Sequence, residues 1–225
     1  MSRKILLFDL FHTLVGPAWS PEDTEYYALG IDGQRWSEAS TDESLYRERA
    51  TGLVKDPQEI IAKIALKAGL ALEPRMVELI TTIRVQKFKD TLLQVEKEVL
   101  ETLAYLKGQS YKLCLISNAD VIDVLYWDES PLKAYFDHVI FSYEAGVMKP
   151  DPAIYEVGLR HFGGLPEEAI FIGDGGSDEL RGAQALGIET IMTTEYSFYG
   201  QESMMNRAVH ADRQVRYLKE LKDLL

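Results

Sequence analysis

Short apolar runs alternate along the chain with longer stretches in which apolar residues recur every three or four positions. The short runs occupy residues 5–10, 111–117, 139–143, 169–173 and 188–193. Their length and their flanking polar turns predict β-strands, and the longer stretches predict helices. Strands that alternate with helices are typical of a parallel α/β sheet, so we expect a five-stranded parallel core.

Start and stop signals support two of the helices that connect these strands. Asp151 precedes Pro152, which is the order expected of an N-cap and a first helical residue, and the helical pattern then runs toward Phe162. Gly187 follows the helical stretch 178–186 as a C-terminal stop. Both helices therefore have defined limits in the sequence.

The chain between the first and second strands is helical in pattern and makes up about a third of the sequence. Helices are expected to begin near Ser20-Pro21, near Asp42, at Asp56-Pro57 and at Pro74. Residues 60, 61, 64, 65 and 68 form one apolar face, and residues 76, 79, 80 and 83 form another. We expect these faces to pack as the core of an all-helical cap domain over residues 16–88. The α/β core would then comprise residues 1–15 and 89–225.

Composition narrows the class of partner. The 225 residues are 46% hydrophobic and carry a formal net charge of −12, without a Lys/Arg-rich run. This balance argues against nucleic acid or an anionic membrane as the main partner and favours a small metabolite.

No apolar stretch has the length of a membrane span, and the first strand begins too early to leave room for a signal peptide, so we expect a cytoplasmic protein. Cys114, the one cysteine, lies in an apolar strand and is expected to be a packed thiol. The pattern does not indicate an oligomeric state.

Three polar residues stand where predicted strands end. Asp9, Ser117 and Asp174 each follow an apolar run, and the carboxyl ends of parallel strands converge on one crevice. A single aspartate at such a position is usually only a cap or turn residue. The ordered set, with Lys149 after the third strand, instead predicts a site that combines a carboxylate nucleophile with a fixed positive charge. A transferring phosphoryl group needs both.

The local sequences around these residues resemble the haloacid dehalogenase (HAD) superfamily of hydrolases. The resemblance rests on the run Asp9 to Leu14, on Ser117 at the end of its strand, on Lys149 before Pro150, and on Asp174 and Asp178 after Gly173. It implies a Rossmann-like core with an inserted helical cap, and a Mg²⁺-dependent phosphatase that acts on a small phosphorylated metabolite.

The resemblance also implies roles for individual residues. Asp9 would be the nucleophile that forms an aspartyl-phosphate, while Ser117 would donate a hydrogen bond to the phosphate and Lys149 would offset the negative charge. The Mg²⁺ ligands would be Asp9, the backbone carbonyl of Phe11, Asp174 and, directly or through a water molecule, Asp178. Substrate-binding roles are expected for three further residues: Thr13, Asn118 and, in the cap, Arg47.

Phe11 departs from the pattern of the phosphatases in this superfamily. Those enzymes usually have a second aspartate two residues beyond the nucleophile, which protonates the leaving group and then activates water. Loss of such an acid/base group typically lowers the rate by about 10² to 10⁴. We therefore expect a slow phosphatase, unless His12 or a cap residue supplies the proton. Its rate should be reduced least for substrates with good leaving groups.

Two alternatives follow from the same residue. The run Asp9 to Leu14 is also similar to the first motif of the L-2-haloacid dehalogenases, which form an ester on the aspartate without a metal. Asp174 argues against this alternative, because those enzymes lack an acid there. The other alternative is a non-catalytic protein that binds a phosphorylated ligand or a protein partner. Outside the motifs, the segment 195–210 is expected to be a loop near the site, an oligomer contact or part of the core packing.

Overall fold

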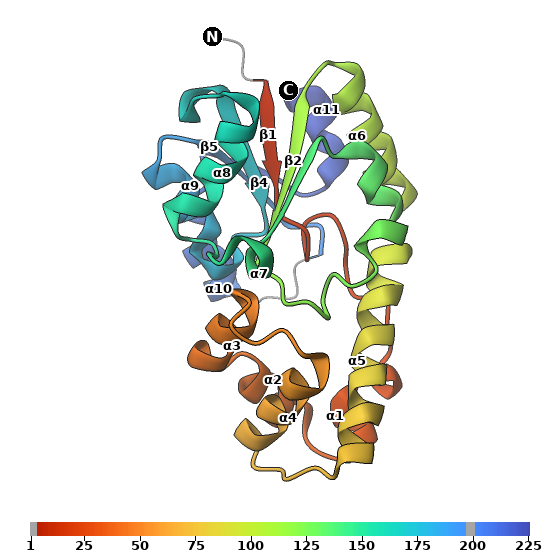
Figure 1. The fold of residues 1–225 in the computed structure, drawn as a ribbon. Coiled ribbons are helices and arrows are strands. Elements are labelled where there is room, and N and C mark those ends of the chain that lie inside the picture. Colours follow the sequence, from red (N-terminus) through yellow and green to blue (C-terminus); the bar gives the residue numbers. More distant parts are fainter. Residues whose placement is uncertain (1–3, 197–200) are drawn as a thin grey trace.

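A parallel β-sheet forms the centre of the computed structural model, which describes residues 4–196 and 201–225 (Figure 1). Its strands are β1 (Ile5–Phe8), β2 (Lys112–Ser117), β3 (His138–Phe141), β4 (Ala169–Gly173), β5 (Glu189–Thr193) and β6 (Arg213–Val215). They are ordered β3-β2-β1-β4-β5-β6, and every pairing is parallel. The predicted α/β class is confirmed, but the prediction of five strands is wrong because β6 adds a sixth at one edge.

Strand β1 lies in the middle of the sheet and carries buried residues on both faces. Leu7 pairs with Cys114 of β2 on one side and with Phe171 of β4 on the other. Leu6 and Phe8 join one hydrophobic core, and Leu7 joins the core on the opposite face. Side chains alternate along a strand, so a strand that is covered on both faces is apolar throughout. Cys114 is fully buried, as expected of a packed thiol.

Helices cover both faces of the sheet (Figure 1). Helices α8 (Pro152–Phe162) and α9 (Glu179–Ala185) pack on one face, and α6 (Lys97–Gly108) and α11 (Leu221–Leu224) lie on the other. The Asp151 carboxylate caps α8, and Gly187 follows α9 with a positive φ, so both predicted limits are confirmed. The short helix α7 (Ser142–Ala145) follows β3, and α10 (Gln201–Ala208) precedes β6.

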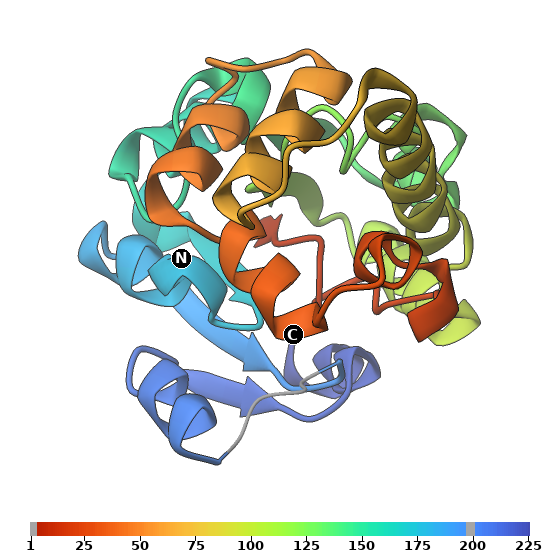
Figure 2. The same ribbon diagram turned by 90° about the horizontal axis from the view of Figure 1, so that it is seen from below.

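The remaining helices belong to the long connection between β1 and β2. They are α1 (Glu25–Leu29), α2 (Gly33–Ser40), α3 (Glu43–Ala50), α4 (Pro57–Lys67) and α5 (Pro74–Leu93). Figures 1 and 2 show them gathered at the end of the molecule to which the carboxyl ends of the strands point. Helix α5 is continuous through residue 88, where the sequence suggests a boundary. The division into two domains stays a prediction.

The predicted starts and faces of these helices agree with the structure in part. Asp42 and Asp56 cap α3 and α4, whereas Pro21 begins only a short 3₁₀ turn, Pro21–Asp23. The predicted face of α4 is buried. The predicted face of α5 is confirmed only in part: Ile80 is buried and Ile83 packs against the same core, whereas Met76 and Leu79 are exposed. The buried side of α5 follows Val77, Ile80 and Arg84, and an arginine interrupts the apolar period there. No helix in the described ranges is long and apolar enough to cross a lipid bilayer.

Candidate active site

A cavity of about 550 Å³ is lined by residues at the carboxyl ends of the strands and by residues of the helices in the long connection. The core contributes Asp9, Phe11, Asn118, Lys149, Asp174 and Glu179 to its wall, and the helical segment contributes Trp19, Tyr46, Arg49, Arg84, Lys87 and Phe88. The sequence places these residues far apart, and the parallel strands bring them to one edge of the sheet. The cavity is therefore the candidate active site.

Lys149 holds two carboxylates at the floor of the cavity. Its Nζ lies 2.5 Å from Asp9 Oδ1 and 2.6 Å from Glu179 Oε2, and all three side chains are buried. Burial would lower the pKa of Lys149, but the charges of Asp9 and Glu179 outweigh it and raise that pKa overall. The ammonium therefore stays charged and offsets part of the negative charge around Asp9.

Asp9, Asp174 and Glu179 form a cluster of three carboxylates. They offer oxygen atoms that all lie within 4.8 Å of one another, so they could hold one metal ion. The backbone N–H of Gly176 donates to Asp174 Oδ1, and that of Gly175 donates to Glu179 Oε1, each at 3.0 Å. Burial raises the pKa values of both Asp9 and Glu179, and the neighbouring carboxylates raise them further. A bound cation would relieve this repulsion.

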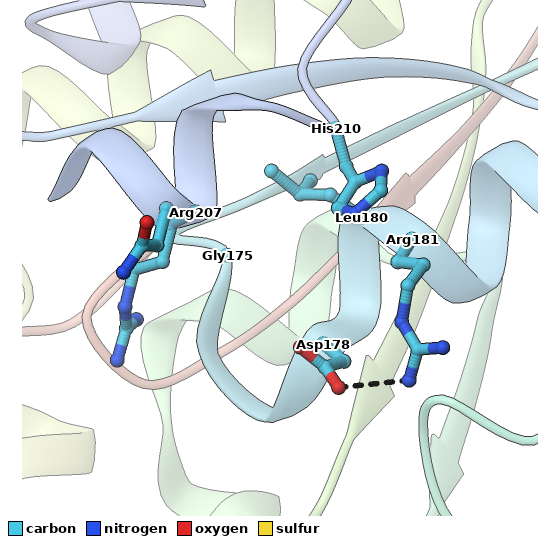
Figure 3. Close-up of a pocket in the computed structure, with 7 residues that line it drawn as sticks. Gly175, Asp178, Leu180, Arg181, Arg207 and His210 are labelled. Atoms are coloured by element: carbon cyan, nitrogen blue, oxygen red, sulfur yellow. Dashed lines mark hydrogen bonds and ion pairs between the residues drawn. The ribbon is translucent and has the colours of Figure 1, made fainter. Parts of the chain in front are cut away.

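Asp178 does not join this cluster. Its side chain is 65% exposed and pairs with Arg181 at 2.8 Å. Figure 3 shows the two side chains turned toward each other. Ser177 and Asp178 both have φ of 54°, and helix α9 begins at the next residue. This turn directs Asp178 outward and Glu179 inward, so the expected position of Asp178 among the metal ligands is not what the structure shows. Glu179 was not among the site residues expected from the sequence, where only its acidic side chain next to Asp178 could have indicated it.

Thr13 contacts the nucleophile candidate, whereas Ser117 ends β2 and is not among the residues that line the cavity. Thr13 is buried, and its Oγ1 donates to Asp9 Oδ2 at 3.0 Å, so it orients that carboxylate. Ser117 is also buried, but its hydroxyl has no hydrogen-bond partner among the described residues. A buried hydroxyl without a partner is costly, and an oxygen atom of a ligand would satisfy it.

Of the remaining predicted contacts, Asn118 lines the cavity and Arg47 does not. The Asn118 side chain bonds to the backbone of Lys149, which occupies its amide with protein partners. Arg47 is exposed on α3 and is absent from the cavity wall. The arginine of α3 that reaches the cavity is Arg49, two positions further on, and it is buried against Asp120 and Asp123.

Arg49 belongs to a buried charge network that the sequence did not predict. Arg84 Nη2 lies 2.7 Å from Asp123 Oδ1, Arg84 Nη1 lies 3.3 Å from Glu25 Oε1, and Lys87 Nζ lies 2.5 Å from Glu25 Oε2. The network joins α1, α3 and α5 to the loop after β2. Buried charges of this kind must be paired, so each partner fixes the others.

Phe11 and His12 complete the wall near Asp9. The Phe11 ring is half-buried and packs edge-on against Phe88 of α5, with ring centroids 5.4 Å apart. His12 has φ of 62° in the turn that follows β1 and also lines the cavity. The position that carries an acid in many phosphatases of the superfamily is thus part of an aromatic contact between the core and α5.

Comparison with known proteins identifies the family of the chain. Residues 4–187 match the family described as haloacid dehalogenase-like hydrolases. The chain belongs to this family, and it is a hydrolase. The expected resemblance and the Rossmann-like fold class are thereby confirmed.

Three similar proteins share only a quarter or less of their residues with this chain. The chain is 25% identical over 237 residues to the glyceraldehyde 3-phosphate phosphatase of Methanopyrus kandleri, covering 99% of this chain and 97% of that protein. The L-2-haloacid dehalogenase of Xanthobacter autotrophicus matches the structure with a TM-score of 0.69 at 19% identity, over 100% and 98% of the two chains. A HAD family enzyme from Bacteroides thetaiotaomicron, crystallised with magnesium and inorganic phosphate, matches with a TM-score of 0.66 at 22% identity, over 89% and 98%. At such identities the structural matches show a common fold.

Proposed function

We propose that the protein is a Mg²⁺-dependent phosphatase that hydrolyses a small phosphorylated metabolite through Asp9. The observation that carries the proposal is the cluster of Asp9, Asp174 and Glu179 around the charged Lys149. A site for displacement on carbon without a metal has no need of three adjacent buried carboxylates. The name of the Methanopyrus kandleri relative, a phosphatase of a small sugar phosphate, supports the same substrate class.

The residues of the chain provide the nucleophile and its orientation. A carboxylate oxygen of Asp9 attacks phosphorus, the bond from phosphorus to the leaving oxygen breaks, and the phosphoryl group is held as an acyl-phosphate on Asp9. Water then attacks this phosphorus, which releases inorganic phosphate and restores the carboxylate. Thr13 and Lys149 hold the two Asp9 oxygens in place, and the Ser117 hydroxyl donates to a phosphate oxygen.

The donor set fits magnesium. Asp9, Asp174 and Glu179 offer only oxygen ligands, which Mg²⁺ prefers, and the backbone carbonyl of Phe11 remains a predicted fourth ligand. The ion would neutralise charge on the phosphoryl oxygens. Asp178 is left out of the proposed ligand set because its side chain pairs with Arg181 at the surface.

Protonation of the leaving group is the weak step of this site. Phe11 cannot donate a proton, and its ring occupies the wall of the cavity beside Phe88. The missing acid therefore lowers the rate of hydrolysis least for substrates whose leaving oxygen is already a weak base, such as acyl phosphates and aryl phosphates. The helical segment 16–88 forms the opposite wall and would select the leaving group.

An L-2-haloacid dehalogenase activity is the second candidate. The aromatic Phe11 favours it, as does the overall fold shared with the enzyme of Xanthobacter autotrophicus. The carboxylates of Asp174 and Glu179 beside Asp9 argue against it, because they repel the carboxylate of a haloacid.

Phosphate release from acetyl phosphate, an aryl phosphate and a panel of alkyl phosphomonoesters would test the proposal. Each assay is run with and without Mg²⁺, for the wild type and for Asp9→Asn. We expect release that requires Mg²⁺ and is lost in Asp9→Asn. Halide release from 2-haloacids without a metal would support the dehalogenase instead. No turnover of either substrate class, with retained phosphate binding, would support a non-catalytic binding protein.

A further inference from the structure

An arginine from the C-terminal part of the chain reaches the carboxylate cluster. Arg207 lies near the end of α10, and its Nη1 is 2.8 Å from Asp174 Oδ2 and 3.5 Å from the Asp174 backbone oxygen. Its side chain is only 19% exposed. Part of the segment 195–210 therefore lies near the site, as one of the expectations had it, but residues 201–208 form helix α10 and not the expected loop. Phe198 and Tyr199 of that segment lie outside the described residues.

Arg207 stands between two cavities. It lines the candidate active site and also a second cavity of about 350 Å³ on the outer side of the loop after β4. Figure 3 shows Arg207 on one side of Gly175 and Arg181 on the other, with Asp178 turned toward Arg181. The two arginines therefore have different partners: Arg207 pairs with the cluster residue Asp174, and Arg181 pairs with the surface residue Asp178.

The loop after β4 is shaped to admit the Arg207 side chain. A Cβ atom on Gly175 would lie 2.9 Å from Arg207 Cβ, and one on Gly176 would lie 3.4 Å from Arg207 Nη1 and 3.0 Å from Asp174 Oδ1. Gly175 also has φ of 81°, which an L side chain rarely adopts. The consecutive glycines thus leave the space in which the guanidinium meets the carboxylate.

The charge balance of the cluster gives this contact a consequence. Lys149 pairs with Asp9 and Glu179, whereas the positively charged partner of Asp174 is Arg207. A divalent ion that binds the cluster also uses Asp174, and two cations on one carboxylate repel each other. The guanidinium and the metal ion therefore compete for the same charge.

We propose that Arg207 is a tethered cation that pairs with Asp174 in the metal-free protein and thereby sets the affinity of the site for its divalent ion. This inference rests on the proposed function, because it requires that Asp174 takes part in metal binding. Arg207 acts through Asp174, so it is a positioning residue. It keeps the carboxylate in place before the metal arrives and weakens metal binding by its own charge.

Metal titration of the full-length protein, stripped of metal with a chelator, would test the inference. Binding of Mg²⁺ is measured by calorimetry and binding of Mn²⁺ by electron paramagnetic resonance, for the wild type, Arg207→Ala, Arg207→Gln and Arg207→Lys. The matched control is Arg181→Ala, which removes an arginine from the same outer cavity without touching Asp174. We expect both neutral variants to bind the ions more tightly by about fivefold or more, and Arg207→Lys and Arg181→Ala to remain close to the wild type.

Thermal unfolding provides a second readout that does not depend on activity. Without metal, the neutral variants are expected to melt at a lower temperature, because Asp174 loses its partner, and added Mg²⁺ should raise their melting temperature more than that of the wild type. Unchanged or weaker metal binding in both neutral variants would overturn the inference and leave the proposed phosphatase intact. Weaker binding of inorganic phosphate with unchanged metal binding would also overturn it, because Arg207 would then contact the phosphoryl group. Absence of metal binding in the wild type would overturn the proposed Mg²⁺ site together with the inference.

Discussion

Asn118 bonds both backbone groups of Lys149, a residue 31 positions away in the sequence. The Asn118 Nδ2 donates to the Lys149 carbonyl at 2.9 Å, and its Oδ1 accepts from the Lys149 N–H at 2.8 Å. These bonds tie the end of β2 to the loop that carries the buried ammonium. Asn118 was expected to bind substrate, but this geometry favours a role in holding Lys149 in place.

The first prediction concerns Asn118→Ala. Two backbone groups lose their partners, so we expect a loss of stability of about 1–3 kcal/mol. We also expect kcat to fall by about 10-fold to 100-fold, because the ammonium is no longer fixed beside Asp9. Steady-state kinetics and denaturant unfolding would measure both effects. Asn118→Asp keeps the hydrogen-bond acceptor but loses the donor, so its stability and kcat should lie between those of the wild type and those of Asn118→Ala. A higher KM with unchanged kcat would instead indicate a direct contact with substrate.

The second prediction separates Glu179 from Asp178. Glu179→Gln removes a charge from the cluster, so metal affinity and turnover should fall by about 10-fold to 100-fold. Asp178→Asn should change neither, because Asp178 is exposed and asparagine tolerates its positive φ. The concentration of Mg²⁺ that gives half-maximal activity measures the difference. A larger effect from Asp178→Asn would restore the ligand that the sequence suggested.

The fold could be predicted largely from the sequence. The apolar runs of β1, β2 and β4 are covered on both faces, and such strands leave a strong signal. Strand β6 was missed because it comprises only Arg213–Val215 and has a single neighbour in the sheet. A three-residue edge strand with polar residues has too little apolar pattern to be recognised.

The site could be predicted only where the sheet determines it. Asp9, Ser117 and Asp174 stand at the carboxyl ends of the neighbouring strands β1, β2 and β4, because parallel strands end at the same edge of the sheet. The inward position of Glu179 depends on the left-handed backbone at Ser177 and Asp178, because that turn determines which of the neighbouring acidic side chains faces the cavity. Arg207 comes from a separate helix, and a contact of this kind leaves no periodic signal in the chain.

The third prediction concerns Glu25 in the buried charge network. Burial would raise the pKa of Glu25, but Lys87 and Arg84 outweigh it and lower that pKa below its ordinary value of 4.5. A lowered pKa stabilises the fold above 4.5, and this contribution is lost as the pH falls through the folded-state pKa. Glu25→Gln should therefore destabilise the protein at neutral pH by about 3–5 kcal/mol and flatten the acid limb of its stability curve.

Denaturant unfolding at a series of acidic to neutral pH values would check the Glu25 prediction. Glu101→Gln is the matched control, because Glu101 pairs with Lys97 at the exposed surface of α6. It should leave the stability almost unchanged. Equal effects from the two variants would mean that the buried pairs contribute no more than a surface pair.

The last prediction concerns the missing acid. Phe11→Asp places a carboxyl group two residues beyond the nucleophile, in the wall of the cavity. If leaving-group protonation limits the wild type, turnover of alkyl phosphates should rise by about 10²-fold, while acyl phosphates gain little. The lost contact with the Phe88 ring should cost about 0.5–1.5 kcal/mol of stability. Phe11→Asn is the matched control, since it has nearly the same shape and cannot transfer the proton. An equal gain in Phe11→Asn would assign the effect to space in the cavity, and no gain in Phe11→Asp with Mg²⁺ still bound would mean that another group already supplies the proton.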